Sequence, residues 1–235
     1  MRFLLLATRP EDVAADEEYA AFLRFTGLRE DQLVRQRLDR APLGDVDLSA
    51  WSGIVLGGSP FTVSDPEDSK GPVQRRVEAE LQALLDEVVA RDVPFLGACY
   101  GIGALGSAVG AVVDKRYGET VGSVTVTLTD EGRGDPLTGA LPASFDAFVG
   151  HKEAISVLPD HAVRLAGSPS CPVQAFRVGR NVYATQFHPE LDGPGLATRI
   201  MTYRHAGYFA PEQADALIAL AHRSAVEHPP LLLRR

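Results

Sequence analysis

A cysteine framed by glycines is the side chain in this sequence best suited to covalent chemistry. Cys99 stands in the segment GACYG (residues 97–101), after an apolar run at residues 93–96 and before a stretch that can form a helix. At such a strand–turn–helix junction, the glycines let the backbone turn sharply and hold the side chain clear of the sheet. The start of the helix favours the thiolate over the thiol. This pattern predicts a nucleophile.

A histidine and a glutamate further along the chain supply the partners that such a nucleophile needs. Both lie in the segment YATQFHPE (residues 183–190), where Pro189 fixes the backbone between them. Residues two apart at a strand end point to the same side, so His188 can accept the thiol proton while Glu190 orients its imidazole. The fold, rather than sequence distance, brings such partners to a cysteine. We interpret Cys99, His188 and Glu190 as nucleophile, base and orienting acid.

Two other interpretations of the same residues remain open at this point. A lone buried cysteine is most often a small hydrophobic residue. The segment GIGALG (residues 101–106) also matches the dinucleotide-binding pattern G-x-G-x-x-G, and Glu119 lies at a distance suited to a ribose-binding acid. That pattern usually belongs to the first strand of a dinucleotide-binding domain, whereas the first strand expected here is residues 2–7. It also leaves Cys99 and His188 without a role.

The elements that must position these residues follow from the apolar pattern of the first half of the chain. Strands are expected at residues 2–7, 33–38, 51–56 and 93–98, and helices at residues 17–25 and 72–91. Strands that alternate with helices form a parallel, doubly wound sheet. Ligands bind such a sheet at the carboxyl ends of its strands, where Cys99 and the segment GGSP (residues 57–60) both lie.

The second half of the chain has a different pattern. Residues 120–129 alternate between apolar and polar side chains, which is typical of antiparallel strands. Further short strands are expected at residues 145–149, 163–165, 173–176 and 182–186, followed by helices at about 195–203 and 211–223. The tail after His228 is expected to be loose. The fold class is therefore α/β, with a mostly parallel doubly wound sheet, additional antiparallel strands and a single domain over residues 1–235.

Composition excludes several classes of protein. The 235 residues are 45% hydrophobic and 23% charged, and the net charge of -8 disfavours nucleic acid as a partner. No apolar run approaches the length of a membrane span, and residues 1–7 are too short for a signal peptide. Cys99 and Cys171 form no C-x-x-C pair, and no cluster suggests a metal. We expect a cytoplasmic protein with no membrane partner, no disulfide and no cofactor.

The segments GACYG, QFHPE and GGSP together resemble those of class I glutamine amidotransferases, in particular the GMP-synthase-like type. The resemblance covers about residues 1–205 and leaves about residues 206–235 as a C-terminal helical extension. It implies a flavodoxin-like fold and hydrolysis of a γ-glutamyl amide through a thioester on Cys99, with release of ammonia or an amine. It also implies a small γ-glutamyl substrate, such as glutamine, and a possible separate synthetase subunit.

The resemblance also implies roles for backbone and substrate-binding groups. The oxyanion hole would use the N–H of Tyr100 and that of Gly58 or Ser59. The substrate site would include Gly57, Gly103, Gly150, His151 and Lys152. Each has a simpler alternative, since the paired glycines can form only a turn and His151 can be a surface residue.

One position departs from the family pattern. Gly103 stands where the family commonly has a glutamine whose amide helps to bind the substrate. We therefore expect weak activity on free glutamine. A γ-glutamyl peptide hydrolase and a non-catalytic regulatory module on the same fold are the alternatives. The chain has no room for the ATP-pyrophosphatase domain of GMP synthase, so we do not expect a complete GMP synthase.

Overall fold

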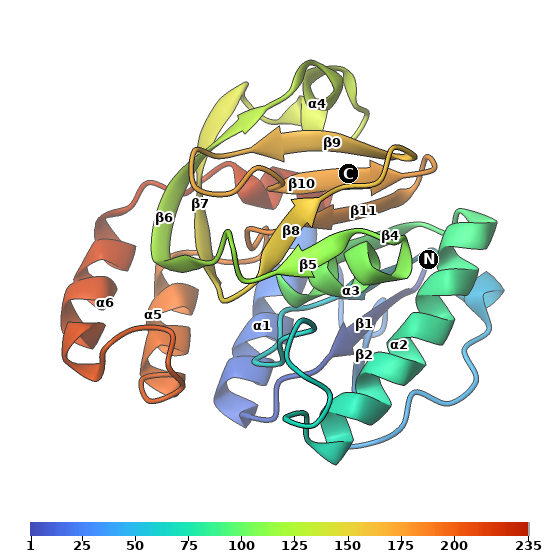
Figure 1. Ribbon diagram of the computed structural model, residues 1–235, viewed down its shortest axis with the longest axis horizontal. Coiled ribbons are helices and arrows are strands. Elements are labelled where there is room, and N and C mark those ends of the chain that lie inside the picture. Colours follow the sequence, from blue (N-terminus) through green and yellow to red (C-terminus); the bar gives the residue numbers. More distant parts are fainter. Residues whose placement is uncertain (235) are drawn as a thin grey trace.

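A mixed sheet of nine strands runs through the computed structural model, which describes residues 1–234 (Figure 1). The strand order is β2-β1-β3-β4-β11-β10-β9-β6-β7. The parallel part comprises β1 (Phe3–Ala7), β2 (Leu33–Arg37), β3 (Gly53–Leu56), β4 (Phe95–Ala98) and β11 (Val182–Thr185). The antiparallel part comprises β6 (Glu119–Leu128), β7 (Ser144–His151), β9 (Ala162–Gly167) and β10 (Ala175–Val178). The expected α/β sheet with additional antiparallel strands is confirmed.

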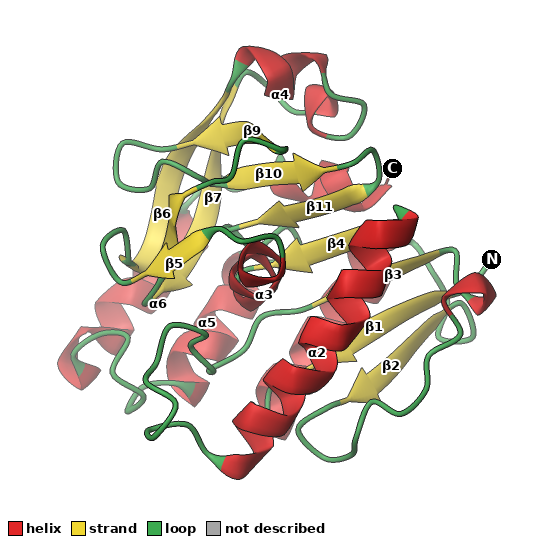
Figure 2. Ribbon diagram, turned by 45° about the vertical axis from the view of Figure 1, so that its right-hand side comes forward, coloured by secondary structure: helices red, strands yellow, loops and turns green. Residues whose placement is uncertain are grey.

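Helices cover both faces of the parallel part (Figure 2). One face carries α2 (Pro72–Arg91) and α3 (Tyr100–Ala108), and the other carries α1 (Asp12–Thr26) and α5 (Gly193–Thr202). Successive residues of a strand point to opposite faces, so Leu4 and Leu6 pack in the core under α2 while Leu5 packs against Phe22 of α1. This alternation explains why the parallel strands are almost continuously apolar.

The helix expected at residues 72–91 is confirmed by α2. Pro72 is its first residue, where a missing N–H costs nothing, and Asp92 ends it with a φ of 51°. Its buried stripe contains Val77, Leu81, Leu84, Leu85 and Val88. The stripe holds α2 against the sheet beside β4, the strand that leads to Cys99.

Several elements were not expected from the sequence. A second, two-stranded sheet pairs β5 (Val112–Asp114) with β8 (Ala154–Val157), and a short helix, α4 (Asp130–Gly134), follows β6. The 3-10 helix η3 (Pro211–Gln213) opens the helical stretch expected at residues 211–223, but three other 3-10 helices were not expected: η1 (Leu48–Ala50), η2 (Thr138–Ala140) and η4 (Pro229–Arg234). The last of these shows that the prediction of a loose tail was wrong, because Pro229, Pro230 and Leu232 are buried.

Further helical elements follow α5. The helix α6 (Ala214–Arg223) packs on α5, and η4 lies against α1. In the described residues, no helix is both long enough and apolar enough to cross a membrane.

Candidate active site

Cys99 occupies a strained turn between β4 and α3. Its backbone has φ 53° and ψ -96°, a conformation that side-chain-bearing residues rarely adopt. The glycines of the GACYG segment allow this turn to pack tightly. A Cβ on Gly97 would lie 2.7 Å from the carbonyl oxygen of Gly101, and one on Gly101 would lie 2.9 Å from the carbonyl oxygen of Leu56. The turn therefore has the geometry of a nucleophile elbow.

The strain at Cys99 leads to an expected result on stability. Replacement by glycine should give a protein about 1 kcal/mol more stable than replacement by alanine, because only glycine adopts a positive φ at little cost. Cys171 provides the control: it is buried and, unlike Cys99, is not in a positive-φ conformation. There the order should reverse, with alanine more stable than glycine by roughly 0.5–1 kcal/mol. Urea unfolding of the four variants measures both differences, and the same order at both positions would contradict the strain.

The segment that follows β11 brings His188 and Glu190 together. The Nδ1 atom of His188 lies 2.8 Å from Oε1 of Glu190, and both side chains are buried. The backbone N–H of Cys99 donates to the carbonyl oxygen of Thr185 at 2.8 Å, which ties the elbow to the end of β11. Cys99 and His188 line the same cavity. The structure thus brings together the three residues that the sequence suggested.

Electrostatics favour a charged His188 beside an ionised Glu190. Burial disfavours the imidazolium, and so does Arg199, whose Nη1 lies 2.9 Å from Nδ1 of His188. The charges of Glu190 and then Cys99 outweigh both and raise the pKa of His188 to about 9. Burial likewise disfavours the carboxylate, but His188 and Arg199 lower the pKa of Glu190 well below its usual value. The guanidinium of Arg199 donates from Nη2 to Glu190 Oε1 at 2.8 Å. Sequence analysis did not identify Arg199, which lies on α5.

The backbone N–H groups at the end of β3 differ in whether an acceptor within the protein already binds them. The N–H of Gly57 donates to the Leu6 carbonyl at 3.1 Å, and the N–H of Gly58 donates to Oε1 of Glu18 at 3.2 Å. In residues 1–234 no acceptor pairs with the N–H of Ser59. Of the two alternatives for an oxyanion donor, the geometry favours Ser59 over Gly58.

The other side of the oxyanion hole would come from α3. The N–H of Tyr100 belongs to the first turn of α3, whose N–H groups have no intrahelical acceptor. Ser59 and Tyr100 both line a cavity beside Cys99. Gly58 has a different role, because the Cβ it lacks would lie 2.8 Å from Cε1 of His188. Because glycine has no Cβ atom, the imidazole of His188 can lie close to the backbone of Gly58.

The residues expected to bind the substrate have protein partners in the structure. The ring of His151 is held by Glu119 through Nε2 at 2.8 Å and by the backbone oxygen of Glu153 through Nδ1 at 2.7 Å. The ammonium of Lys152 donates to the Ala206 carbonyl at 3.0 Å and lies 4.5 Å from the ring centre of Tyr208. Gly150, His151 and Lys152 nevertheless line a cavity beside Cys99.

Gly57 and Gly103 pack against carboxylates and do not line the cavities that contain Cys99. A Cβ on Gly57 would lie 2.6 Å from Oε2 of Glu18. A Cβ on Gly103 would lie 3.1 Å from Oε1 of Glu153, whose carboxylate accepts the N–H groups of Val63 and Ser64 at 2.8 and 2.7 Å. A glutamine at position 103 would therefore compete with Glu153 for space. Glu153 holds the loop after β3 against the site.

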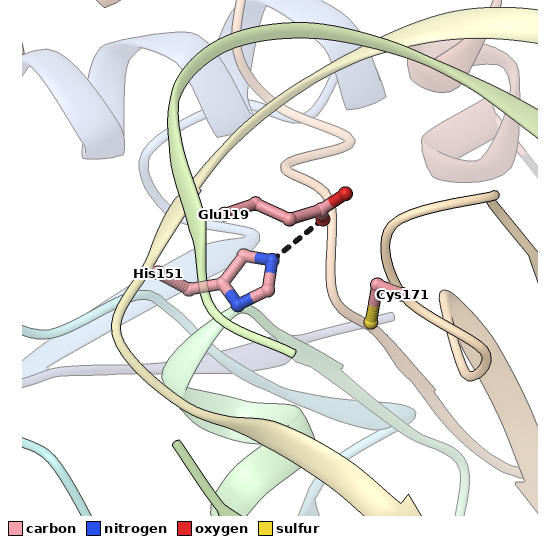
Figure 3. A group of neighbouring side chains, drawn as sticks. All are labelled: Glu119, His151 and Cys171. Carbon is pink, nitrogen blue, oxygen red and sulfur yellow. Dashed lines mark hydrogen bonds and ion pairs between the residues drawn. The ribbon is translucent and has the colours of Figure 1, made fainter. Parts of the chain in front are cut away.

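Glu119 belongs to a buried network next to the site rather than to a nucleotide site (Figure 3). Its carboxylate accepts from His151 and Gln174, and also from Ser170. The glycines of GIGALG lie within α3 and not in a loop before it, so the dinucleotide interpretation does not fit.

The same network contains a group of residues whose types suit a metal ion. Ligand atoms of Glu119, His151 and Cys171 lie within 4.8 Å of one another. Two features favour a structural role for this group. The facing atoms of Glu119 and His151 are already hydrogen-bonded to each other, and burial raises the pKa of the Cys171 thiol to about 12.

Two adjoining cavities flank Cys99. The first, the His188 lobe, is lined by His188, Arg9 and Tyr203 together with apolar side chains. The second, the Glu153 lobe, is lined by Glu153, Lys152 and Gln186. The lobes share Ser59, Cys99, Gly150 and Tyr208. A substrate held at Cys99 can thus extend in two directions.

Comparison with known proteins gives a consistent result. The family model described as "Glutamine amidotransferase class-I" matches residues 37–201. The chain is similar to two curated proteins named "GMP synthase [glutamine-hydrolyzing]". The one from Borreliella burgdorferi is 29% identical over 64% of this chain and 26% of its own length. The one from Porphyromonas gingivalis is 31% identical over 66% of this chain and 28% of its own length. The matched region thus spans about a quarter of each curated relative.

Solved structures share the fold. A glutamine amidotransferase from Thermotoga maritima superposes with a TM-score of 0.73 at 21% identity, over 100% of this chain and 97% of its own. A glutamine amido transferase from Methylobacillus flagellatus gives a TM-score of 0.69 at 17% identity, over 99% of this chain and 92% of its own. The mixed sheet and its flanking helices are therefore an architecture that these proteins have in common.

Proposed function

We infer that this chain, which belongs to the class I glutamine amidotransferase family, is an amidohydrolase that cleaves a γ-glutamyl amide through a thioester on Cys99. One observation carries the proposal: a cysteine in a strained elbow lines a cavity together with His188, whose ring is paired with the buried Glu190. A structural cysteine needs neither the strained backbone nor the charged partner. A non-catalytic module on this fold would leave both unexplained.

The proposed reaction begins with Cys99 in its thiolate form beside a protonated His188. The sulfur attacks the γ-carbonyl carbon, and Ser59 and Tyr100 donate their N–H groups to the oxygen that becomes negative. His188 gives its proton to the amide nitrogen as the carbon–nitrogen bond breaks. Water, deprotonated by His188, then attacks the thioester, which releases glutamate and restores the thiolate.

Glu190 and Arg199 act through His188 in this scheme. The carboxylate holds the imidazole by its Nδ1 atom and stabilises the imidazolium, and Arg199 fixes the carboxylate. The α-amino and α-carboxylate groups of the glutamyl part would occupy the Glu153 lobe, beside Gly150, His151 and Lys152. If glutamine is the substrate, the ammonia would serve a separate synthetase. A catalytic thiol suits a reducing compartment, so we place the protein in the cytoplasm.

A glutamine-like electrophile tests the proposal directly. A diazoketone analogue of glutamine should label the native protein once, and mass spectrometry of peptides should place the label on Cys99. Cys171 is the internal control, because it is fully buried and absent from both cavity linings. Glutamate release from a panel of γ-glutamyl amides should accompany the labelling. An unlabelled Cys99, together with no glutamate release from any amide, would disprove the proposed function.

A further inference from the structure

The two lobes beside Cys99 differ in the chemistry of their walls. The Glu153 lobe is lined by several polar and charged side chains, which suit the charged head of a glutamyl group: Thr62, His151, Lys152, Glu153 and Gln186. The His188 lobe has apolar walls at Val121, Val149, Leu191, Leu196, Ile200 and Phe209. Ammonia, the leaving group of glutamine, has no surface to bury against such walls. The apolar lining of the His188 lobe therefore favours a leaving group that has an apolar surface of its own.

The position of His188 decides which lobe faces the leaving group. In an amide hydrolysis the general acid must contact the nitrogen that departs. His188 lines the lobe named after it and does not line the Glu153 lobe. Tyr100, a proposed oxyanion donor, lines only the Glu153 lobe. A substituent on the amide nitrogen would therefore extend into the His188 lobe.

The walls of the His188 lobe include parts of the chain beyond the family match. Arg9 precedes the matched residues 37–201, and Tyr203, Tyr208 and Phe209 follow them. Lys152 holds this last segment in place through the Ala206 carbonyl and the Tyr208 ring. The lobe is therefore built from elements that the shared amide chemistry does not require.

Arg9 places a charged donor at this lobe. Its Nε donates to Oε1 of Glu18 at 2.9 Å, and its Nη1 donates to the Tyr203 hydroxyl at 3.2 Å. Among the described residues no acceptor pairs with Nη2, which lies against Gly58. The guanidinium is nearly buried and held on two sides. It can offer Nη2 to a carboxylate without reorganising.

We propose that the His188 lobe binds the amine part of an N-substituted γ-glutamyl amide, and that this amine is an amino acid with an apolar or aromatic side chain. The inference rests on the proposed function and names its substrate class. The apolar walls would hold the side chain, and Arg9 would bind the carboxylate. Cys99 displaces the amino acid nitrogen, which takes the proton of His188, and water then releases glutamate. The net reaction consumes one water and gives glutamate and the free amino acid.

Four substrates separate the contributions of the two features. The leaving amine of γ-glutamylphenylalanine carries both an aromatic group and a carboxylate. That of γ-glutamylphenethylamine carries only the aromatic group, and that of γ-glutamylglycine carries only the carboxylate. The ammonia released from glutamine carries neither group. We expect kcat/KM for γ-glutamylphenylalanine to exceed that for glutamine by ~10-fold or more, with the other two amides between them. Glutamate release measures all four.

Two substitutions then assign each preference to its residue. Phe209→Ala should reduce the advantage of the phenylalanine amide over the glycine amide by ~10-fold. Arg9→Gln should reduce its advantage over the phenethylamine amide by a similar factor. Arg24→Gln is the matched control, because Arg24 lies on α1 in an exposed ion pair with Asp192. If Arg9→Gln fails to fold because Glu18 loses its partner, Phe209→Ala and the native substrate series still decide.

The outcomes distinguish this inference from the proposed function. If native protein hydrolyses glutamine as well as or better than every substituted amide, the lobe is not a leaving-group site, while the amidohydrolase proposal stands. If γ-glutamylphenylalanine binds the Cys99→Ala protein ~10-fold more tightly than glutamine, but native protein cleaves neither, the lobe is supported and the proposed function fails. If native protein cleaves none of the four amides, and calorimetry shows no preference of the Cys99→Ala protein for γ-glutamylphenylalanine, both the inference and the proposed function are overturned.

Discussion

Replacement of Cys99 by alanine is expected to lower kcat/KM for γ-glutamyl amide hydrolysis by ~10⁴-fold or more, because no other group can form the thioester. The fold should persist, since alanine keeps the same backbone conformation and removes only the sulfur of a partly buried side chain at the cavity. Steady-state kinetics with coupled detection of glutamate measures the loss, and circular dichroism measures the fold.

The second cysteine supplies the control for this result. Cys171 is fully buried in the network around Glu119, far along the chain from the elbow. Cys171→Ala should therefore keep most of the activity while losing some stability. Near-native turnover by Cys99→Ala would disprove a thioester on Cys99. A large loss of activity confined to Cys171→Ala would mean that Cys171, and not Cys99, is the nucleophile.

Replacement of Glu190 by glutamine is expected to lower kcat by ~10²-fold or more and to move the alkaline limb of kcat/KM to lower pH. Glu190 is the largest of the charges that raise the pKa of His188 to about 9. In native protein, His188 can therefore donate its proton up to about pH 9. Without the carboxylate, that limit should fall by about 1–3 pH units.

The free energy of unfolding of the native protein should also decrease as the pH rises. Because the folded-state pKa of His188 lies above its ordinary value of 6.5, the pairing stabilises native protein fully below about pH 6.5. This contribution is lost as the pH rises through about 9. The Glu190→Gln protein should lack that loss, and urea unfolding at a series of pH values measures the difference.

A neighbouring carboxylate provides the matched control for Glu190. Glu17 lies 3.6 Å from Arg199 and is also partly buried, but it has no hydrogen bond to His188 in the described residues. Glu17→Gln should leave the alkaline limb where it is. Equal shifts in both variants would mean that the limb reflects the general charge of the cluster and not the His188–Glu190 pair.

The sequence alone was enough to identify the core fold and the main chemical groups. The apolar stripe of α2 and the short buried strand before Cys99 are local signals, with periods that a helix or a strand imposes. The GACYG and QFHPE segments are also local, so the candidate nucleophile and its proposed partners could be named without the structure. The short strands β5 and β8 and the buried tail could not, because each is stabilised mainly by contacts with distant residues.

The details of the site depend on pairs that sequence reasoning could not join. The bond from the Gly58 N–H to Glu18 connects residues 40 apart, and it decides which N–H remains for an oxyanion. The bond from Ser64 to Glu153 connects residues 89 apart, and it explains what fills the space beside Gly103. Arg9 offered one weak signal, its place two residues after the end of the first strand, at the edge where such sheets bind ligands.

The segment from Tyr203 to Phe209 has a consequence for how relatives of this protein can diverge. It lies outside the family-matched region yet forms part of the wall of the His188 lobe. If that lobe binds the leaving amine as proposed, substitutions in this segment would change substrate choice and leave the elbow, His188 and Glu190 untouched. Two descendants could then share every motif by which the family is recognised and still act on different molecules. Evolutionary studies would then have to trace the reaction and the substrate preference through different segments of the same gene.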